Sequence, residues 1–65
     1  MAHRITFTSK YGAHETARLR GAPDRDSAAV WIVNQFPGST VKAVEAIDEG
    51  AAYTWGEHDL GRFFR

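Results

Sequence analysis

Hydrophobic and polar residues alternate along the first twenty positions of the chain. This pattern predicts a strand from about His3 to Lys10, a turn at residues 11–13 and a second strand from about His14 to Arg20. Because side chains in a strand alternate in direction, the hairpin has an apolar face and a basic, threonine-rich face. The apolar face carries Ile5, Phe7, Ala17 and Leu19, and the basic face carries Arg4, Thr6, Thr8, Lys10, His14, Thr16, Arg18 and Arg20.

The register of this hairpin is predicted from the same pattern. A three-residue loop keeps apolar residues opposite apolar residues, whereas a two-residue loop mixes the two faces. The pairs that follow are Ile5–Leu19, Phe7–Ala17, Arg4–Arg20 and Lys10–His14. Like charges directly opposite in a sheet are destabilising, by roughly 0.2–1 kcal/mol a pair, so we expect an anionic partner for the basic face. The alternative is that these residues only keep an exposed sheet face polar.

A single helix is predicted after the hairpin. Residues 21–23 (Gly-Ala-Pro) break the second strand, and the carboxylate of Asp24 suits an N-cap. The helix extends to about Gln35 and is ended by the Phe-Pro-Gly run at residues 36–38. The residues expected to cover the sheet are Ala29, Ile32, Val33 and Phe36.

The remainder of the chain predicts three further strands. Residues 40–47 form the third strand, whose apolar residues change face in a way that a bulge would explain. Residues 51–55 form a fourth strand, residues 56–61 a loop, and residues 62–65 a final edge strand or a frayed end. We therefore expect one α+β domain over residues 1–65, with the helix on one face of an antiparallel sheet. Counted along the chain, the strand order is 2-1-3-4-5.

Composition limits what so small a domain can do. The chain has 65 residues and no cysteine, which predicts a cytoplasmic protein without disulfides. Its start shows no signal peptide, and its apolar runs are too short to span a membrane. The net charge is zero but unevenly spread: residues 1–25 carry five basic and two acidic side chains, and residues 26–59 carry one basic and six acidic. A bipolar surface suited to oriented docking is the expectation.

The candidate chemistry favours binding over catalysis. Tyr53 and Trp55 share a strand face, where they either anchor a partner or pack beneath the helix. The three histidines lack metal-ligand spacing, and residues 57–59 (Glu-His-Asp) are too close in sequence to converge on one ion. No catalytic spacing or phosphate loop is present, so no enzyme activity, metal or cofactor is expected. The predicted binding residues are Arg4, Lys10, His14, Arg18, Arg20, Tyr53 and Trp55.

Three segments carry a resemblance to a class of known proteins: residues 26–29 (Asp-Ser-Ala-Ala), residues 36–41 (Phe-Pro-Gly-Ser-Thr-Val) and the pair Val44-Glu45. Together with the predicted element order, they resemble small sheet-and-helix proteins of phages and mobile elements, including some anti-CRISPR proteins. One such group binds the backbone subunits of type I surveillance complexes and has five antiparallel strands and one helix. The resemblance implies that Arg4, Lys10, Arg18 and Arg20 occupy a guide–target DNA path.

The sequence therefore predicts a non-enzymatic binding protein. It would inhibit a host protein or nucleoprotein by docking through the basic sheet face, with Tyr53 or Trp55 as an apolar anchor. One alternative is a small nucleic-acid-binding domain that uses the same face. Another is a structural module that forms a homodimer by pairing of an exposed edge strand.

Overall fold

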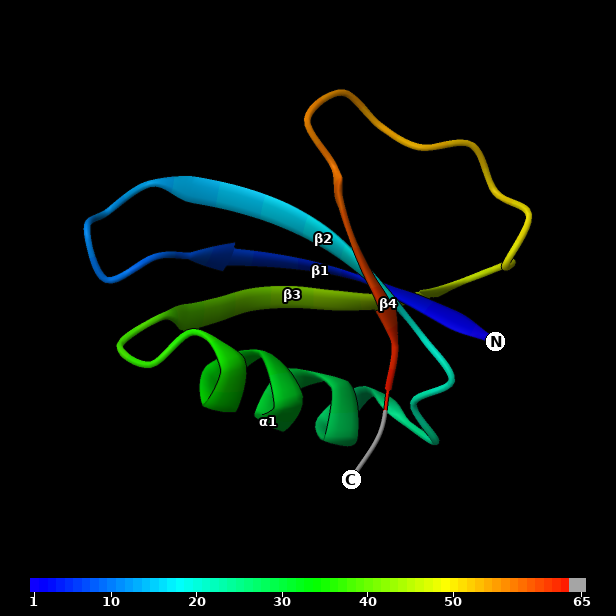
Figure 1. Ribbon diagram of the computed structural model, residues 1–65, viewed down its shortest axis with the longest axis horizontal. Helices are drawn as coiled ribbons and strands as arrows, with labels where there is room; N and C mark the ends of the chain where they lie inside the picture. Colours follow the sequence, from blue (N-terminus) through cyan, green and yellow to red (C-terminus); the bar gives the residue numbers. More distant parts are fainter. Residues whose placement is uncertain (64–65) are drawn as a thin grey trace.

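One helix packs on one face of a four-stranded sheet, so the α+β class is confirmed (Figure 1). The computed structural model describes residues 1–63 of the chain. In spatial order the strands are β3-β1-β2-β4. The elements are β1 (Ala2–Thr8), β2 (His14–Arg20), α1 (Arg25–Gln35), β3 (Thr40–Ile47) and β4 (His58–Arg62).

The prediction of five antiparallel strands in the order 2-1-3-4-5 is wrong. The first three strands have the predicted order, but β4 lies beside β2 and runs parallel to it, which makes the sheet mixed. Residues 51–55, predicted as a strand, lie within the segment that joins β3 to β4. We call residues 48–57 the β3–β4 connection. It leaves the sheet at the β3 edge and returns at the opposite edge, so β4 pairs with β2 and not with β3 (Figure 1). Of the predicted last strand, only Arg62 is in β4, and residues 64–65 lie outside the described part of the chain.

The predicted hairpin register is wrong by two residues. Arg4 is opposite Arg18 and Ile5 is opposite Ala17, so the connection between the strands has five residues, 9–13. Ser9 organises this connection: its carbonyl accepts a hydrogen bond from the Gly12 N–H, and its hydroxyl accepts from the N–H groups of Tyr11 and Ala13. A shift of two residues leaves every side chain on its predicted face. The two-faced character of the hairpin is therefore preserved.

The predicted bulge in the third strand is confirmed. Thr6 is opposite Ala43 and Phe7 is opposite Val41, so Lys42 is the extra residue. The bulge lets both Val41 and Val44 pack against the core. In a regular strand, residues 41 and 44 would point to opposite faces, and the bulge between them brings both side chains to the core side.

The helix begins as predicted but covers the sheet with a different stripe. Asp24 is the N-cap, and its carboxylate accepts a 2.7 Å hydrogen bond from the Ser27 N–H. The buried helical residues are Ala28 and Ile32, which lie one turn apart on one face. Two residues of the predicted stripe are exposed, Val33 at 42% and Phe36 at 40%. The helix is rotated so that the small Ala28 lies against the strands.

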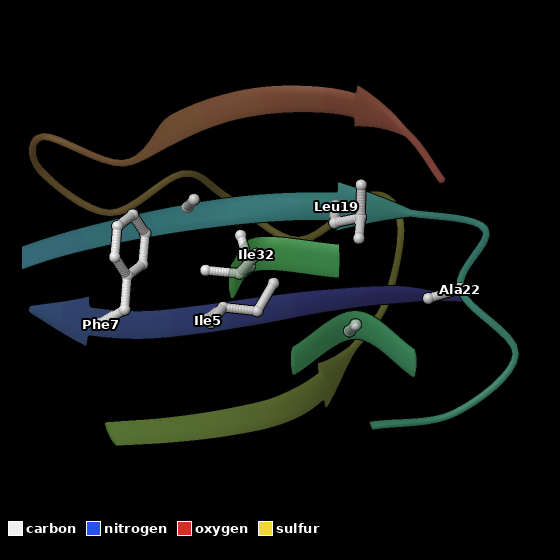
Figure 2. Packing of buried hydrophobic residues seen from close by; sticks show 7 residues of the cluster. Ile5, Phe7, Leu19, Ala22 and Ile32 are labelled. Carbon is white, nitrogen blue, oxygen red and sulfur yellow. The ribbon is translucent and has the colours of Figure 1, made fainter. Parts of the chain in front are cut away.

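The core lies between the helix and the apolar face of β1 and β2. Figure 2 shows Ile5 beside Ile32, with Phe7 and Leu19 on either side along the strands. The cluster consists of Ile5, Phe7, Ala17, Leu19, Ala22, Ala28 and Ile32. All four residues of the predicted apolar hairpin face belong to it.

A histidine shares this apolar face. His3 is opposite Leu19, only 2% of its surface is exposed, and its Nδ1 has no hydrogen-bond partner among the described residues. Burial lowers the pKa of His3 below its ordinary value of 6.5. The N-terminal ammonium and Arg25 lower the pKa further, and Asp24 opposes them.

We expect His3 to destabilise the fold in mild acid. Its folded pKa is below the unfolded value, so the unfolded chain binds more protons and the free energy of unfolding falls as the pH drops below 6.5. In a His3→Leu variant this part of the decrease should be absent. Urea unfolding across this pH range measures it, with His14→Leu as an exposed control. An identical pH profile for wild type and His3→Leu would contradict the expectation.

Candidate functional site

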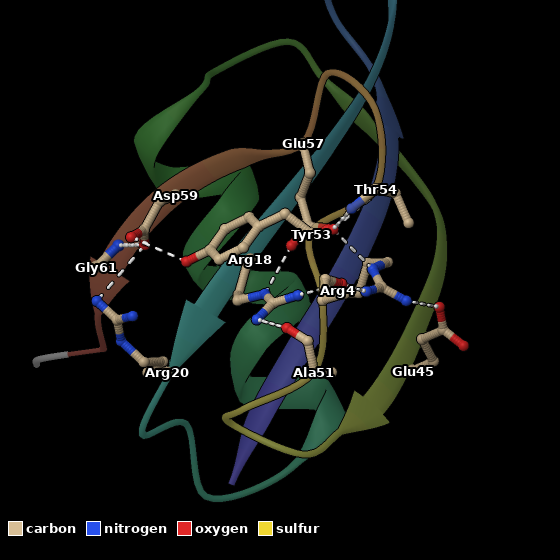
Figure 3. A network of polar contacts seen from close by, with 11 residues as sticks. Arg4, Arg18, Arg20, Glu45, Ala51, Tyr53, Thr54, Glu57, Asp59 and Gly61 are labelled. Atoms are coloured by element: carbon tan, nitrogen blue, oxygen red, sulfur yellow. Dashed lines mark hydrogen bonds and ion pairs between the residues drawn. The ribbon is translucent and has the colours of Figure 1, made fainter.

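The β3–β4 connection covers the basic face of the hairpin where Arg4 and Arg18 lie (Figure 3). The Arg18 side chain is 1% exposed, and that of Arg4 is 17% exposed. The Glu57 side chain, which ends the connection, has no exposed surface. These three charged side chains therefore form the interior of a second, polar layer on the sheet face opposite the helix.

The Arg18 side chain holds the β3–β4 connection in two ways: it forms an ion pair with Glu57, and it donates hydrogen bonds to backbone carbonyls of the connection. Its Nε donates to Glu57 Oε2 at 2.6 Å, and its terminal nitrogens donate to the carbonyl oxygens of Ala51 at 2.7 Å and Ala52 at 3.1 Å. The ring of Tyr53 stacks on the guanidinium, with 3.9 Å between the Arg18 Cζ and the ring centroid. These two carbonyls accept hydrogen bonds from the Arg18 guanidinium. Residues 51–55, predicted as a fourth strand, therefore lie over the polar face of the sheet and form no strand.

Arg4 completes the attachment from the neighbouring strand. Its Nε donates to Glu57 Oε1 at 2.9 Å, and its terminal nitrogens reach the Ala52 carbonyl at 3.2 Å and Glu45 Oε1 at 3.3 Å. Arg4 and Arg18 are directly opposite in the sheet, a like-charge arrangement that is unfavourable by itself. The carboxylate of Glu57 accepts from both guanidinium groups, and this offsets their repulsion.

Glu57 also fixes the turn that precedes it. Its Oε1 accepts hydrogen bonds from the Thr54 N–H at 3.2 Å and the Thr54 hydroxyl at 2.9 Å. Burial by itself would raise the pKa of Glu57. The hydrogen bonds from Thr54, Arg18 and Arg4 outweigh it and lower this pKa from 4.5 to about 2. The carboxylate is therefore ionised at every pH at which the protein is expected to work.

The turn presents an exposed tryptophan. We call residues 54–57 the Trp55 turn; it is closed by a 3.1 Å hydrogen bond from the Glu57 N–H to the Thr54 carbonyl. Gly56 has a φ of +75°, which glycine adopts without strain at the third position of such a turn. Trp55 is 101% exposed, and Tyr53 is 49% exposed with its hydroxyl donating to Asp59 Oδ2 at 3.1 Å. Of the two interpretations of these aromatics, packing beneath the helix is wrong.

The other predicted binding residues are divided between ion pairs and open surface. Arg20 is one-third exposed and lies 3.6 Å from Asp59. Lys10 and His14 are exposed, Lys10 within the hairpin connection and His14 at the start of β2. The structure thus brings Arg4, Arg18 and Tyr53 together beneath the connection and leaves Lys10, His14 and Trp55 accessible.

Glu57 is the residue that the sequence interpretation missed. Its position within a predicted loop, residues 56–61, gives no local reason to expect a buried carboxylate. The available signal was the opposite charge of the two chain segments, because the acidic segment pairs with the basic one. The pairs are Glu45 with Arg4, Glu57 with Arg4 and Arg18, Asp59 with Arg20, and Glu49 with the N-terminal ammonium. Part of the charge that was expected to form a bipolar surface is therefore used in ion pairs within the chain, some of them buried and some exposed.

No protein-family model matches the chain, and no curated protein or solved structure shows significant similarity to it. Within residues 1–63, no three His, Cys, Asp or Glu side chains are grouped so that they could hold a metal ion. None of the helices in the described part of the chain has the length and apolarity that crossing a membrane requires. The geometry of the Trp55 turn and its support is therefore the basis for a functional proposal.

Neutralising Glu57 tests this support. We expect Glu57→Gln to lower the free energy of unfolding at neutral pH by about 3–5 kcal/mol, because two largely buried guanidinium groups lose their shared charge partner. In the wild type this stabilisation is fully present above pH 4.5 and is lost as the pH falls towards 2; the variant should lack that acid-dependent loss.

Denaturant unfolding measures both effects. Glu49→Gln is the matched control, since Glu49 forms an exposed pair with the N-terminus, and it should change the stability by less than about 1 kcal/mol. Equal losses from the two substitutions would contradict the role assigned to Glu57.

Proposed function

We propose that this protein is a non-enzymatic binding protein that docks on a protein or nucleoprotein partner through the Trp55 turn. The observation that supports this most directly is the complete exposure of Trp55 on a turn that is held in place by the buried carboxylate of Glu57. Tryptophan is enriched among the residues that dominate binding energies at interfaces. Core packing does not explain a tryptophan at position 55, because Trp55 is not part of the described core.

The support beneath Trp55 favours affinity. The Glu57 N–H closes the turn, Thr54 is bound to the Glu57 carboxylate, and that carboxylate is held by two arginines. A side chain on a backbone that is already ordered loses little conformational entropy on binding. Burying an indole removes about 150–250 Å² from water, a transfer free energy of about 4–6 kcal/mol. One rigid anchor can therefore supply much of the energy of a small interface.

The accessible basic residues give the partner its expected charge. Lys10 and His14 lie at the hairpin end of the sheet, and Lys42 is exposed at the bulge of β3. None of these three forms an ion pair within residues 1–63. An acidic partner surface suits these accessible basic residues. Inhibition of a host protein or nucleoprotein, with cytoplasm as its compartment, is part of the proposal and is tested by the identity of the partner.

The geometry reduces the support for the alternative of nucleic-acid binding. The two arginines at the centre of the basic face donate to Glu57 and to backbone carbonyls, so phosphates would have to displace those contacts. Charge reversal of Arg18 would disrupt the fold along with any docking. A substitution at Trp55 is the cleaner test.

We expect Trp55→Ala to weaken partner binding by at least about 30-fold while changing the free energy of unfolding by no more than about 0.5 kcal/mol. The assay is affinity capture from nuclease-treated lysate of the source cells, followed by titration of the purified partner. Val30→Ala is the matched control, because Val30 is also exposed (59%) but lies on the helix. Undiminished binding by Trp55→Ala would overturn the proposal, and loss of capture on nuclease treatment would favour nucleic acid.

A further inference from the structure

An apolar groove lies on the helix side of the sheet, between the hairpin connection, the end of α1 and the start of β4. It has a volume of about 570 Å³, within the range of sites that hold small ligands or large side chains. The helix packs against β1 and β3, so this part of β2 and β4 lacks a cover of its own. The groove is lined mainly by Phe7, Tyr11, Ala17, Phe36, Pro37 and Leu60.

Aromatic rings form the accessible walls of this groove. Phe36 stacks on Phe7 with 5.5 Å between ring centroids, yet 40% of Phe36 is exposed, and Tyr11 is 85% exposed. Offset aromatic stacking is the contact geometry that an indole prefers. Lys10, Glu15, His58 and Asp59 stand around these rings, so the rim carries both signs of charge.

Trp55 and the groove lie at the same edge of the molecule. Trp55 precedes His58 by three residues, and His58 both begins β4 and lines the groove. The β3–β4 connection, which contains Trp55, is attached to Arg4 and Arg18 on the sheet face opposite the helix, whereas the groove is on the helix side. In the structure the Trp55 side chain is fully exposed and does not line the groove of its own copy.

We infer that the occupant of the groove is Trp55 of a second copy of this chain. Two copies that meet at the β4 edge about a two-fold axis can exchange their tryptophans, and such an isologous contact closes at the dimer. The mixed charge of the rim suits this arrangement, because Lys10 of one copy can join the Glu15–His58 pair or the Arg20–Asp59 pair of the other, each of which spans 3.6 Å and is partly exposed. The inference rests on the proposed function in one respect, since it uses the same exposed Trp55 as the docking side chain and adds a second copy of this chain as an occupant of the groove.

The area involved sets the strength of the dimer. Each exchanged indole buries about 150–250 Å² of its own surface and a similar area of the groove, so the pair buries about 600–1,000 Å² in total. This is at or below the lower limit for specific, stable interfaces. A weak, reversible dimer that is half-formed near 0.1 mM, as an order-of-magnitude estimate, is therefore the expected species.

The test uses Trp55 as its own reporter. In a Trp31→Phe background, the fluorescence of Trp55 is followed from about 1 µM to about 1 mM, with sedimentation velocity on the same samples. We expect a concentration-dependent shift of the emission to shorter wavelength, in step with dimer formation. Trp55→Ala and the groove variants Phe36→Glu and Tyr11→Glu should each weaken the dimer at least about 30-fold. Tyr11→Glu guards against misfolding, because Tyr11 is largely exposed. Val30→Glu is the control outside the groove and should leave the dimer unchanged.

Two results would overturn the inference: a monomer at about 1 mM, or a dimer that neither Trp55→Ala nor Tyr11→Glu weakens. The second result would indicate self-association through another surface, such as pairing of an edge strand. The failure of this inference is distinguishable from failure of the proposed function. If the protein is monomeric but Trp55→Ala abolishes capture of a partner, only the assignment of the second copy fails. If Trp55→Ala changes neither dimer formation nor partner capture, both the inference and the proposed function fail.

Discussion

The polar layer of the structure, and with it the position of Trp55, depends on one carboxylate shared by two arginines. Glu57 accepts from Arg4 and Arg18, which lie opposite each other on β1 and β2, and the same carboxylate fixes Thr54. Removing three charged groups from water is unfavourable unless nearly all of their hydrogen bonds are satisfied. The carbonyls of Ala51 and Ala52 accept hydrogen bonds from N–H groups of the two guanidinium groups that Glu57 does not reach. The path of the β3–β4 connection is therefore set in part by the need to satisfy these buried donors.

This arrangement explains how a chain of 65 residues with a small apolar core orders a ten-residue connection. The apolar face of the sheet is covered by a helix, and the polar face is covered by backbone attached to side-chain charges. The basic side chains of residues 1–25 and the acidic side chains of residues 26–59 thus form ion pairs largely with each other. The surface that remains for a partner is defined by one aromatic side chain and a few unpaired basic residues, Lys10 and Lys42 among them.

The sequence carried the local information well. Alternation between Ile5 and Leu19 predicted both faces of the hairpin, Asp24 predicted the N-cap, and the spacing of Val41 and Val44 predicted the bulge. It did not carry the long-range pairing of Glu57, because an acidic residue in a Gly-rich segment has the same local pattern whether it is solvated or buried. A prediction that lacks the Glu57 contact assigns residues 51–55 to a strand and has no basis for pairing β4 with β2. Two residues of the predicted site, Arg4 and Arg18, instead hold the connection that carries Trp55 through their contacts with Glu57.

The sequence separation of these ion pairs has a consequence for the order of folding. Glu57 is 53 residues from Arg4 and 39 from Arg18, whereas the hairpin pairs form between near neighbours in the chain. Contacts between distant residues close large loops, and they form only after local elements have restricted the chain. The hairpin positions both guanidinium groups, so the connection can dock only where the hairpin is formed. In any state in which these long-range ion pairs are open, the Trp55 turn has no fixed position, and binding competence therefore depends on the contacts that cost the most loop-closure entropy.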